Sequence, residues 1–441
     1  MTKNTWQRVA AIVVVGLFLC VSAFAGGQGE PGATSESAGV TQLELWTFQD
    51  LHIQFYKEMA KRWNEANPDR QVSINATAYP YDEMHNQLLV ALQSGVGAPD
   101  IVDIEISRFP NYLRGTPQLV SMNDKVEPIM GDLVKARYDI YAKDGTYYGL
   151  PFHVGATVMY YNMDILGQAG VDPDQINTWD DYIAAGKKVV AATGKPMTTV
   201  EVTEQWTFWP LVSERGSGFV DKNGKVILDN ETNINTLEFL HGLIYDSKIA
   251  IPTPGGFHHS EEYYGFMNDG GAASVMMPFW YMGRFTDYMP DLKGKIAIRP
   301  LPRFTPNGNR SAGMGGTGTV VTKQSKHVEL AKDFLAYAKL SKEGNILIWT
   351  LLGFDPPRWS VWDDPALKKE NKFTDYFQNG TKIFDEVLKI RNEINPVYMS
   401  PQIPDIISII QSEVMYQALA DQSKTPQQAL TDAANTIRKQ Q

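Results

Sequence analysis

Residues 43–48 read Leu-Glu-Leu-Trp-Thr-Phe, and they open the pattern that decides the fold. Their apolar and polar side chains alternate, which is typical of a β-strand. Apolar residues then recur every four positions at Phe55, Met59 and Trp63, so we predict one face of a helix there. An Asn-Pro pair at residues 67–68 should end this helix.

The same pattern continues along the next forty residues. Residues 72–78 alternate again as a strand, and residues 84–92 carry an apolar side chain every four positions before Gly95. Residues 101–106, Ile-Val-Asp-Ile-Glu-Ile, predict a third strand. Strand, helix, strand, helix and strand at short spacing indicate an open α/β sheet with parallel strands.

A second unit begins near residues 148–151, Tyr-Gly-Leu-Pro, and Thr178 is the predicted N-cap of a helix within it. The last hundred residues read mainly as helices interrupted by prolines. Further strands are predicted at residues 154–161, 273–277, 295–299 and 319–321. We therefore predict two α/β lobes with a ligand cleft between them. Lobe one is assigned residues 42–152 with about 318–345, and lobe two residues 153–317 with about 346–441.

The first 25 residues are predicted to be a secretory signal peptide. Two basic residues precede an apolar run over residues 9–21, and Ala-Phe-Ala at residues 23–25 offers a cleavage site. A flexible linker is expected over residues 26–41. Cys20, the only cysteine, lies inside the apolar run, and lipidation there is kept as the alternative to cleavage after Ala25. We expect an exported protein, periplasmic or on the outer face of the cytoplasmic membrane, either free or lipid-anchored.

The charge of the mature chain excludes two classes of partner. Cleavage after Ala25 removes Lys3 and Arg8, so the 40 basic residues fall to 38 beside 50 acidic ones, for a formal charge of −12. Nucleic acids and anionic membrane surfaces need clustered Lys and Arg, so neither is expected as a partner. We expect a monomer.

Two carboxylates share one face of the predicted strand over residues 101–106. Asp103 and Glu105 alternate with apolar residues, and Ser107 follows in phase at the carboxyl end, where open α/β sheets bind ligands. For Asp103, a ligand contact and a place on a solvated strand face remain equally open. Glu105, nearer the strand end, is favoured as an acceptor for a ligand hydroxyl.

Residues 313–318 match the dinucleotide pattern G-x-G-x-x-G, but a strand rather than a helix is predicted after them. We therefore reject nucleotide binding and interpret Gly315 and Gly316 as exposed backbone that lets a ligand approach closely. Because the chain also lacks a P-loop, an H-E-x-x-H motif and a nucleophile elbow, we expect no cofactor, metal or catalytic residue.

Three aromatic clusters indicate sugar binding. They lie at residues 204–210, 278–281 and 356–359, and each combines rings with proline and polar or charged neighbours. Aromatic rings stack on the apolar faces of sugars, while polar side chains bind the hydroxyls. The candidates from these clusters are Trp206, Trp280, Arg358 and Trp359.

Over essentially its whole mature length the chain resembles the extracellular solute-binding proteins of carbohydrate ABC importers, the class that includes maltose-binding protein. The stretches that carry this resemblance are residues 45–47 (LWT), 97–102 (GAPDIV), 148–151 (YGLP) with 161–162 (YN), 178–182 (TWDDY) and 277–280 (MPFW). Within the class, residues 80–82 and 108–109 are most similar to members that handle lactose or arabinose-type sugars.

The resemblance implies a two-lobed periplasmic-binding-protein-like α/β fold with a ligand cleft and a hinge. It also implies ligand contacts at Phe48, Gln49, Tyr81, Asp82, Glu105, Ser107, Arg108 and Trp280. Where maltose-binding protein has a carboxylate after its Tyr-x-x-Pro stretch, this chain has Gly155 with His153 nearby. His153 joins the candidates, and the hydroxyl contacts must differ from those made to maltose.

The predicted function is therefore the extracytoplasmic substrate-binding component of an ABC sugar importer. It would bind a mono- or oligosaccharide by hinge closure and present the closed form to the membrane permease. An exported glycoside hydrolase that uses Asp103 and Glu105 is the alternative, because paired carboxylates perform that chemistry. A surface receptor that senses sugar without transport is a third possibility.

Overall fold

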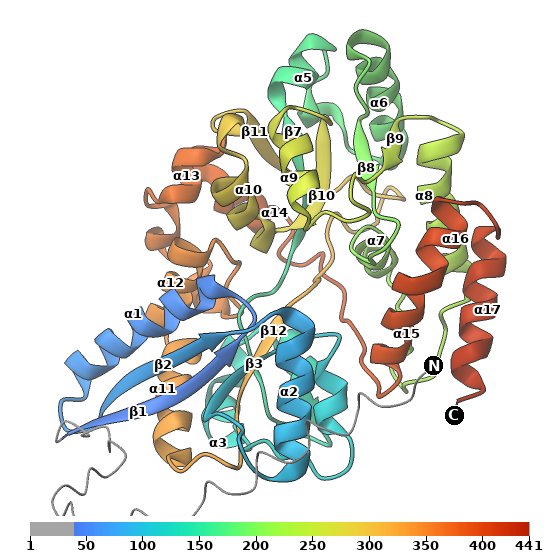
Figure 1. Cartoon of the computed structure of the whole chain (residues 1–441). Helices are drawn as coiled ribbons and strands as arrows, with labels where there is room; N and C mark the ends of the chain where they lie inside the picture. Colours follow the sequence, from blue (N-terminus) through green and yellow to red (C-terminus); the bar gives the residue numbers. More distant parts are fainter. Residues whose placement is uncertain (1–38, 441) are drawn as a thin grey trace, which may run out of the picture. The chain divides into compact units, whose positions relative to one another are not determined.

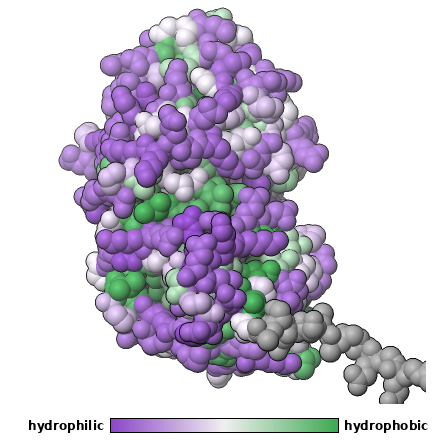
Figure 2. All heavy atoms as spheres, turned by 90° about the vertical axis from the view of Figure 1, so that its left-hand side faces the viewer, coloured by the Kyte–Doolittle hydropathy of each residue, from purple (hydrophilic) through white to green (hydrophobic). Residues whose placement is uncertain are grey.

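The structure, a computed structural model, describes residues 39–440. The predicted signal peptide, Cys20 and most of the predicted linker lie outside the described residues. Within the described part of the chain, no helix is long and apolar enough to cross a membrane. On the face shown in Figure 2, hydrophilic residues cover most of the surface, and hydrophobic ones gather mainly in a band across the middle.

The first sheet has five strands in the order β2-β1-β3-β12-β6 (Figure 1). Its central strand β3 pairs in parallel with β1, which pairs in parallel with β2, as the sequence predicted. Strand β12 comes from far along the chain and runs antiparallel to both β3 and β6. The bounds are β1 (Val40–Thr47), β2 (Gln71–Ala78), β3 (Ile101–Glu105), β6 (Leu150–Pro151) and β12 (Thr317–Val321).

Helices cover both faces of this sheet. Helix α1 (Asp50–Ala66) packs with α11 (Val328–Leu340) and α12 (Lys342–Leu352) on one face. Helix α2 (Tyr81–Ser94), which ends at Gly95 as predicted, packs on the other face. Every residue of β3 is therefore buried, and of the two alternatives left open for Asp103, the place on a solvated strand face is wrong. Shorter elements of this part are α3 (Asn123–Val126), α4 (Lys135–Tyr138), β4 (Ala142–Lys143) and β5 (Thr146–Tyr147).

The second sheet is antiparallel throughout, in the order β10-β7-β11. Beside it lies a parallel pair of short strands, β8 and β9. Strand β7 begins later than predicted, because the backbone amides of residues 154–156 bond to Asp355 instead of a neighbouring strand. The strand bounds are β7 (Thr157–Asn162), β8 (Thr198–Val200), β9 (Ala250–Pro252), β10 (Ser274–Pro278) and β11 (Ile296–Pro300).

Helices surround the second sheet and make up most of the C-terminal part, as predicted. Thr178 caps α6 and forms a capping box with Asp181, which satisfies backbone amides of the first turn. The bounds are α5 (Met163–Gln168), α6 (Trp179–Thr193), α7 (Phe208–Glu214), α8 (Glu231–Tyr245), α9 (Glu261–Asn268), α10 (Met282–Tyr288), α13 (Lys372–Tyr376), α14 (Ile383–Lys389), α15 (Ile403–Ile409), α16 (Met415–Leu419) and α17 (Pro426–Arg438). A π-helical turn, Ile410–Val414, joins α15 to α16.

Three segments run between the two parts: residues 152–156 join β6 to β7, residues 312–316 lead into β12, and residues 353–357 follow α12. They are hydrogen-bonded to one another. The carboxylate of Asp355 accepts from the amides of Gly155 at 3.1 Å and Ala156 at 2.8 Å, while Thr157 N donates to Ala312 O at 2.9 Å. Burial raises the pKa of Asp355 to about 7. We call these three segments the crossings.

Candidate ligand-binding site

A polar group lies where strand β3 ends. Tyr81 Oη and the backbone amide of Ser107 each donate to Glu105 Oε2 at 2.8 Å, and Ser107 Oγ donates to the same oxygen. The other carboxyl oxygen, Oε1, is buried and has no hydrogen-bond partner within residues 39–440. Burial raises the pKa of Glu105, although the Ser107 and Tyr81 hydroxyls oppose that effect. One acceptor position of Glu105 is thus left open.

Charged and aromatic neighbours frame this carboxyl. Arg108 donates to Asp82 Oδ1 at 2.7 Å, and its guanidinium lies 5.4 Å from the centroid of the Tyr81 ring. The Phe48 ring meets Tyr81 edge to face with 5.4 Å between centroids. Five elements of the prediction, Phe48, Tyr81, Asp82, Arg108 and the Glu105-Ser107 pair, therefore come together here.

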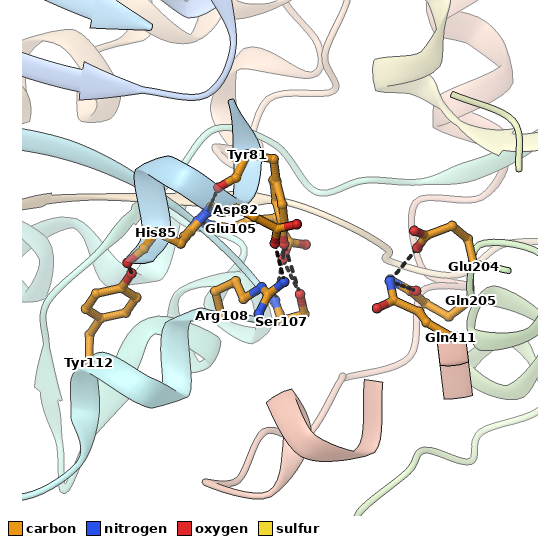
Figure 3. Close-up of polar contacts among 10 residues, drawn as sticks. All are labelled: Tyr81, Asp82, His85, Glu105, Ser107, Arg108, Tyr112, Glu204, Gln205 and Gln411. Atoms are coloured by element: carbon orange, nitrogen blue, oxygen red, sulfur yellow. Dashed lines mark hydrogen bonds and ion pairs between the residues drawn. The ribbon is translucent and has the colours of Figure 1, made fainter. Parts of the chain in front are cut away.

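A second polar group faces the first (Figure 3). Gln411 Nε2, in the π-helical turn, donates to Glu204 Oε2 at 2.5 Å and to Gln205 Oε1 at 2.9 Å. Burial raises the pKa of Glu204 to about 7, and the negative charges of Glu105 and Asp82 add to that rise. The carboxyls from the two groups are thus near enough to influence each other.

Trp280 provides an aromatic surface next to Trp206, which follows Glu204 and Gln205 in the chain. Its half-buried ring meets Trp206 at 5.7 Å with an interplanar angle of 78°, and stacks on His259 at 5.4 Å and 22°. The neighbouring Phe279 and Tyr281 are buried, so Trp280 is the ring of this cluster that remains partly exposed. The short helical turn after β10 points two of them into the core.

The glycine segment joins the aromatic surface to the end of β3. Trp280 Nε1 donates to Met314 O at 3.2 Å, and a Cβ on Gly315 would lie 2.8 Å from that nitrogen. Both Gly315 and Gly316 have positive φ, at +70° and +133°, which favours glycine. Gly315 is buried under the Trp280 ring and Gly316 is half-buried beside Tyr141, so the expectation of exposed backbone at these glycines is wrong. Gly316 O accepts from the amide of Ile106 at 2.9 Å. Strand β12 follows Gly316, as predicted. The dinucleotide motif would need a helix at this place, so the strand agrees with the rejection of nucleotide binding.

Two further predicted residues lie where the two parts of the protein meet: Gln49 contacts α10, and His153 lies in the first crossing. Gln49 Oε1 accepts from Arg284 of α10 at 3.1 Å, which links the two parts of the protein. His153 is buried at the first crossing, with its ring edge-to-face against Phe354 at 5.1 Å. Burial lowers the pKa of His153 well below its usual value, so the ring is neutral.

Arg358 and Trp359 have other partners. Arg358 Nε donates to Asp132 Oδ2 at 2.7 Å. The Trp359 ring packs against Trp362 at 5.1 Å and under the Arg391 guanidinium at 5.0 Å. These contacts tie Arg358 to the short helical turn before α4, and Trp359 to the helical region after the third crossing, rather than to Glu105 or Trp280.

Asp103 is enclosed by partners from the protein itself. It is 0% exposed, and its oxygens lie 2.9 Å from His52 Nδ1, 3.0 Å from Tyr56 Oη and 2.7 Å from Thr319 Oγ1. Burial alone would raise its pKa, but His52, Lys339 and Thr319 outweigh burial and hold the pKa below its usual value. A hydrolase needs both carboxyls at the substrate, so the hydrolase alternative fails on this residue.

Gln411 and His259 were missed as site residues by the sequence reasoning. Gln411 is 207 residues from Glu204 in the chain and sits in an irregular helical turn, so no local pattern points to it. For His259 no sequence pattern indicated a role in the site, and only the fold places its ring on Trp280.

Known proteins resemble the chain in sequence and in fold. The model of the bacterial extracellular solute-binding protein family matches residues 49–344. An arabinooligosaccharide-binding protein of Bacillus subtilis (strain 168) is 53% identical over 98% of this chain and 99% of its own length. One from Halalkalibacterium halodurans is 54% identical, over 90% of this chain and 89% of its own length.

Solved structures share the fold at low identity. A binding protein of a B. animalis subsp. lactis ABC transporter, in complex with beta-1,6-galactobiose, gives a TM-score of 0.74 at 22% identity and covers 90% of this chain and 97% of that one. Maltose-bound T. maritima MalE3 gives 0.71 at 21% identity, with 91% and 100% covered. The predicted two-lobed α/β fold is confirmed. By its family match and its close relatives, this chain belongs to the bacterial extracellular solute-binding proteins, which bind solutes and are not enzymes.

Proposed function

We propose that the protein is the substrate-binding component of an ABC sugar importer and that its ligand is an arabinooligosaccharide. The observation that carries this is the pair of relatives above 50% identity, both arabinooligosaccharide-binding proteins. The site supports it, since the open Glu105 oxygen, the facing Glu204–Gln411 group and the Trp280 ring suit a hydroxyl-rich, partly apolar ligand.

In this proposal the sugar lies between the two polar groups. One hydroxyl of the sugar donates to Glu105 Oε1, while Gln411 and Glu204 form hydrogen bonds with hydroxyls on the opposite side of the sugar. The Trp280 ring carries one sugar face, and Gly315 supports that ring, because a Cβ at this position would collide with it. The remaining predicted contacts are Phe48, Gln49, Tyr81, Asp82, Ser107, Arg108, His153 and Trp206.

Closure would occur at the crossings. Lobe one is residues 42–152 with about 318–345. Because α12 packs on α1, we extend this lobe to residue 352. Lobe two is residues 153–317 with the rest of the C-terminal part. A ligand that contacts both lobes favours the closed form, because only that form makes every contact at once. The Gln49–Arg284 hydrogen bond is then one of the contacts that closure makes. The protein acts as an exported monomer that presents the closed form to the permease.

Isothermal titration calorimetry tests the function. The chain from residue 26 is titrated with arabinotriose, maltotriose and lactose at pH 7. We expect saturable one-to-one binding of arabinotriose and much weaker binding of the other two. No heat with arabinotriose, together with saturable binding of another sugar, would contradict the proposed ligand.

Two tryptophan variants test the site within the same experiment. Trp280→Ala should weaken binding by about 10- to 100-fold, as loss of a central aromatic contact does. Trp359→Ala is the matched control, because its ring contacts Trp362 and Arg391 instead of the Glu105 group. Equal losses in the two variants would show that the sugar does not lie on Trp280.

A further inference from the structure

A buried carboxyl lies behind the aromatic surface. Glu201 follows strand β8, and His258 lies in the loop after β9. Because β8 and β9 are parallel, the loops that follow them both start at the carboxyl end of the pair. Backbone hydrogen bonds hold the loops together, from Thr253 N to Val200 O and from Val202 N to Gly256 O, both at 2.9 Å.

The Glu201 carboxyl joins these two loops through its two oxygens. It is 0% exposed, Oε2 accepts from the backbone amide of Trp206 at 2.8 Å, and Oε1 accepts from the amide of His258 at 2.9 Å. Trp206 and His259, the residue after His258, both contact the Trp280 ring from these two loops. One side chain thus sets the backbone positions from which both neighbours of Trp280 extend.

His258 extends the same network to residues 278–281, the segment that holds Trp280. Its ring nitrogen Nε2 lies 2.8 Å from Thr199 Oγ1 and 3.1 Å from Thr253 Oγ1. Its carbonyl accepts from the hydroxyl of Tyr281, the residue after Trp280, at 2.5 Å. Burial raises the pKa of Glu201 to about 8, and the hydrogen bonds from the backbone amides of His258 and Trp206 oppose that rise.

We propose that Glu201 is a positioning residue for sugar binding: it holds Trp206 and His259 against Trp280, and with them the aromatic face of the site. Glu201 itself does not contact the ligand. The inference rests on the proposed function, because Trp280 is the ring on which the sugar is placed. It adds that the geometry of this ring depends on a carboxyl buried behind it.

The first test needs no ligand. Two indoles at the distance and angle of Trp206 and Trp280 give a coupled signal in circular dichroism. The part of the spectrum that is lost in Trp206→Phe comes from this pair. The Trp359–Trp362 pair keeps its signal in that variant, so the two signals can be told apart. Glu201→Gln keeps the size of the side chain but presents one acceptor instead of two. We expect it to weaken the coupled signal. A signal equal to that of the wild type would overturn the proposal.

The control is Glu214→Gln. Glu214 is also a buried carboxyl of the second part, on α7, and burial raises its pKa well above the usual value. Within residues 39–440, neither oxygen of its carboxyl has a hydrogen-bond partner. The coupled signal should survive in this variant, whatever happens to stability. Its loss here to the same extent would mean that any buried carboxyl has this effect, and the proposal would fall.

The second test is a double-mutant cycle in arabinotriose binding. Glu201→Gln should raise Kd about tenfold, the effect of one lost buried hydrogen bond. In a Trp280→Ala background the same change should raise Kd less than about twofold, because the ring through which it acts is gone. An equal increase in both backgrounds would overturn the proposal. If the wild type binds no sugar, the proposed function fails, and the coupled signal still decides the role of Glu201.

Discussion

Asp103 and Glu105 stand two residues apart on the same face of strand β3, yet their surroundings are opposite. Asp103, mid-strand, is fully buried and both of its oxygens have partners on α1 or β12. Glu105, the last residue of the strand, is 7% exposed, and only one of its oxygens has partners within residues 39–440. Their pKa values shift in opposite directions, down for Asp103 and up for Glu105.

This difference shows that position along a strand, rather than residue type, separates a structural carboxyl from a ligand-binding one. The middle of a parallel sheet is covered by helices on both faces, so a charge there needs partners from the protein. The carboxyl end opens toward the ligand crevice, so a carboxyl there can keep an oxygen for the ligand.

The largest expected effect is on stability, in Asp103→Ala. Removing this carboxylate leaves His52 and Tyr56 buried without their shared partner. We expect the free energy of unfolding to fall by about 3–5 kcal/mol, the usual result of breaking a buried pair. Urea unfolding followed by circular dichroism measures it. A loss under about 1 kcal/mol would mean that Asp103 is not the structural member of the pair.

The next largest effect is on binding, in Glu105→Gln. The amide keeps the shape but removes a carboxyl oxygen, so arabinotriose binding should weaken by about 10- to 100-fold, as for a lost hydrogen bond to a charged group. At pH 4.5 the free energy of unfolding should change by less than about 1 kcal/mol. Calorimetry measures the affinity, with the exposed Glu83→Gln on α2 as control. Unchanged affinity in Glu105→Gln would remove this residue from the site.

The opposite pKa shifts predict opposite responses to pH. The pKa of Asp103 is lowered from 3.8, so its contribution to stability is present above that pH and is lost as pH falls through the folded-state pKa. The pKa of Glu105 is raised from 4.5, so its contribution is full below that pH and is lost as pH rises through the folded-state pKa.

Unfolding of the wild type, Asp103→Asn and Glu105→Gln across pH 3–8 checks this. The advantage of the wild type over Asp103→Asn should shrink toward pH 3. Relative to Glu105→Gln, the wild type should lose up to about 1.4 kcal/mol per pH unit above pH 4.5, until the folded-state pKa is reached. Differences that move in the same direction for both variants would refute the contrast.

The smallest effect is expected at the edge of the site, in Asp82→Asn. This carboxylate is 74% exposed and pairs with Arg108 at 2.7 Å. Exposed pairs contribute about 0–1 kcal/mol, so thermal unfolding should change little and arabinotriose affinity by less than about threefold. A loss of affinity as large as that of Glu105→Gln would place the main carboxylate contact at Asp82 instead.

The sequence predicted the first sheet well because its signals are local. Alternation over residues 43–48 and the four-residue spacing of Phe55, Met59 and Trp63 each define one element, and both elements form as expected. The grouping of Tyr81 with Glu105 followed from the resemblance to a family and from the strand end. By contrast, burial of Asp103 depends on Thr319, more than two hundred residues away, and no local pattern carries that information.

The second half of the site was less predictable for the same reason. The aromatic clusters pointed to Trp206 and Trp280, but which rings face the core depends on a short helical turn that the residue types do not specify. Gln411 reaches Glu204 only because a π-helical turn in the C-terminal part lies beside the loop after β8. Long-range packing, rather than residue type, decides these contacts.

A crystal structure with arabinotriose bound is the most direct test of where the ligand sits. We expect a sugar hydroxyl within about 3 Å of Glu105 Oε1 and a sugar face on the Trp280 ring, with the Asp103 oxygens still held by His52, Tyr56 and Thr319. A sugar bound elsewhere, with Glu105 Oε1 bonded only to the protein, would contradict the assignment of the strand end as the site.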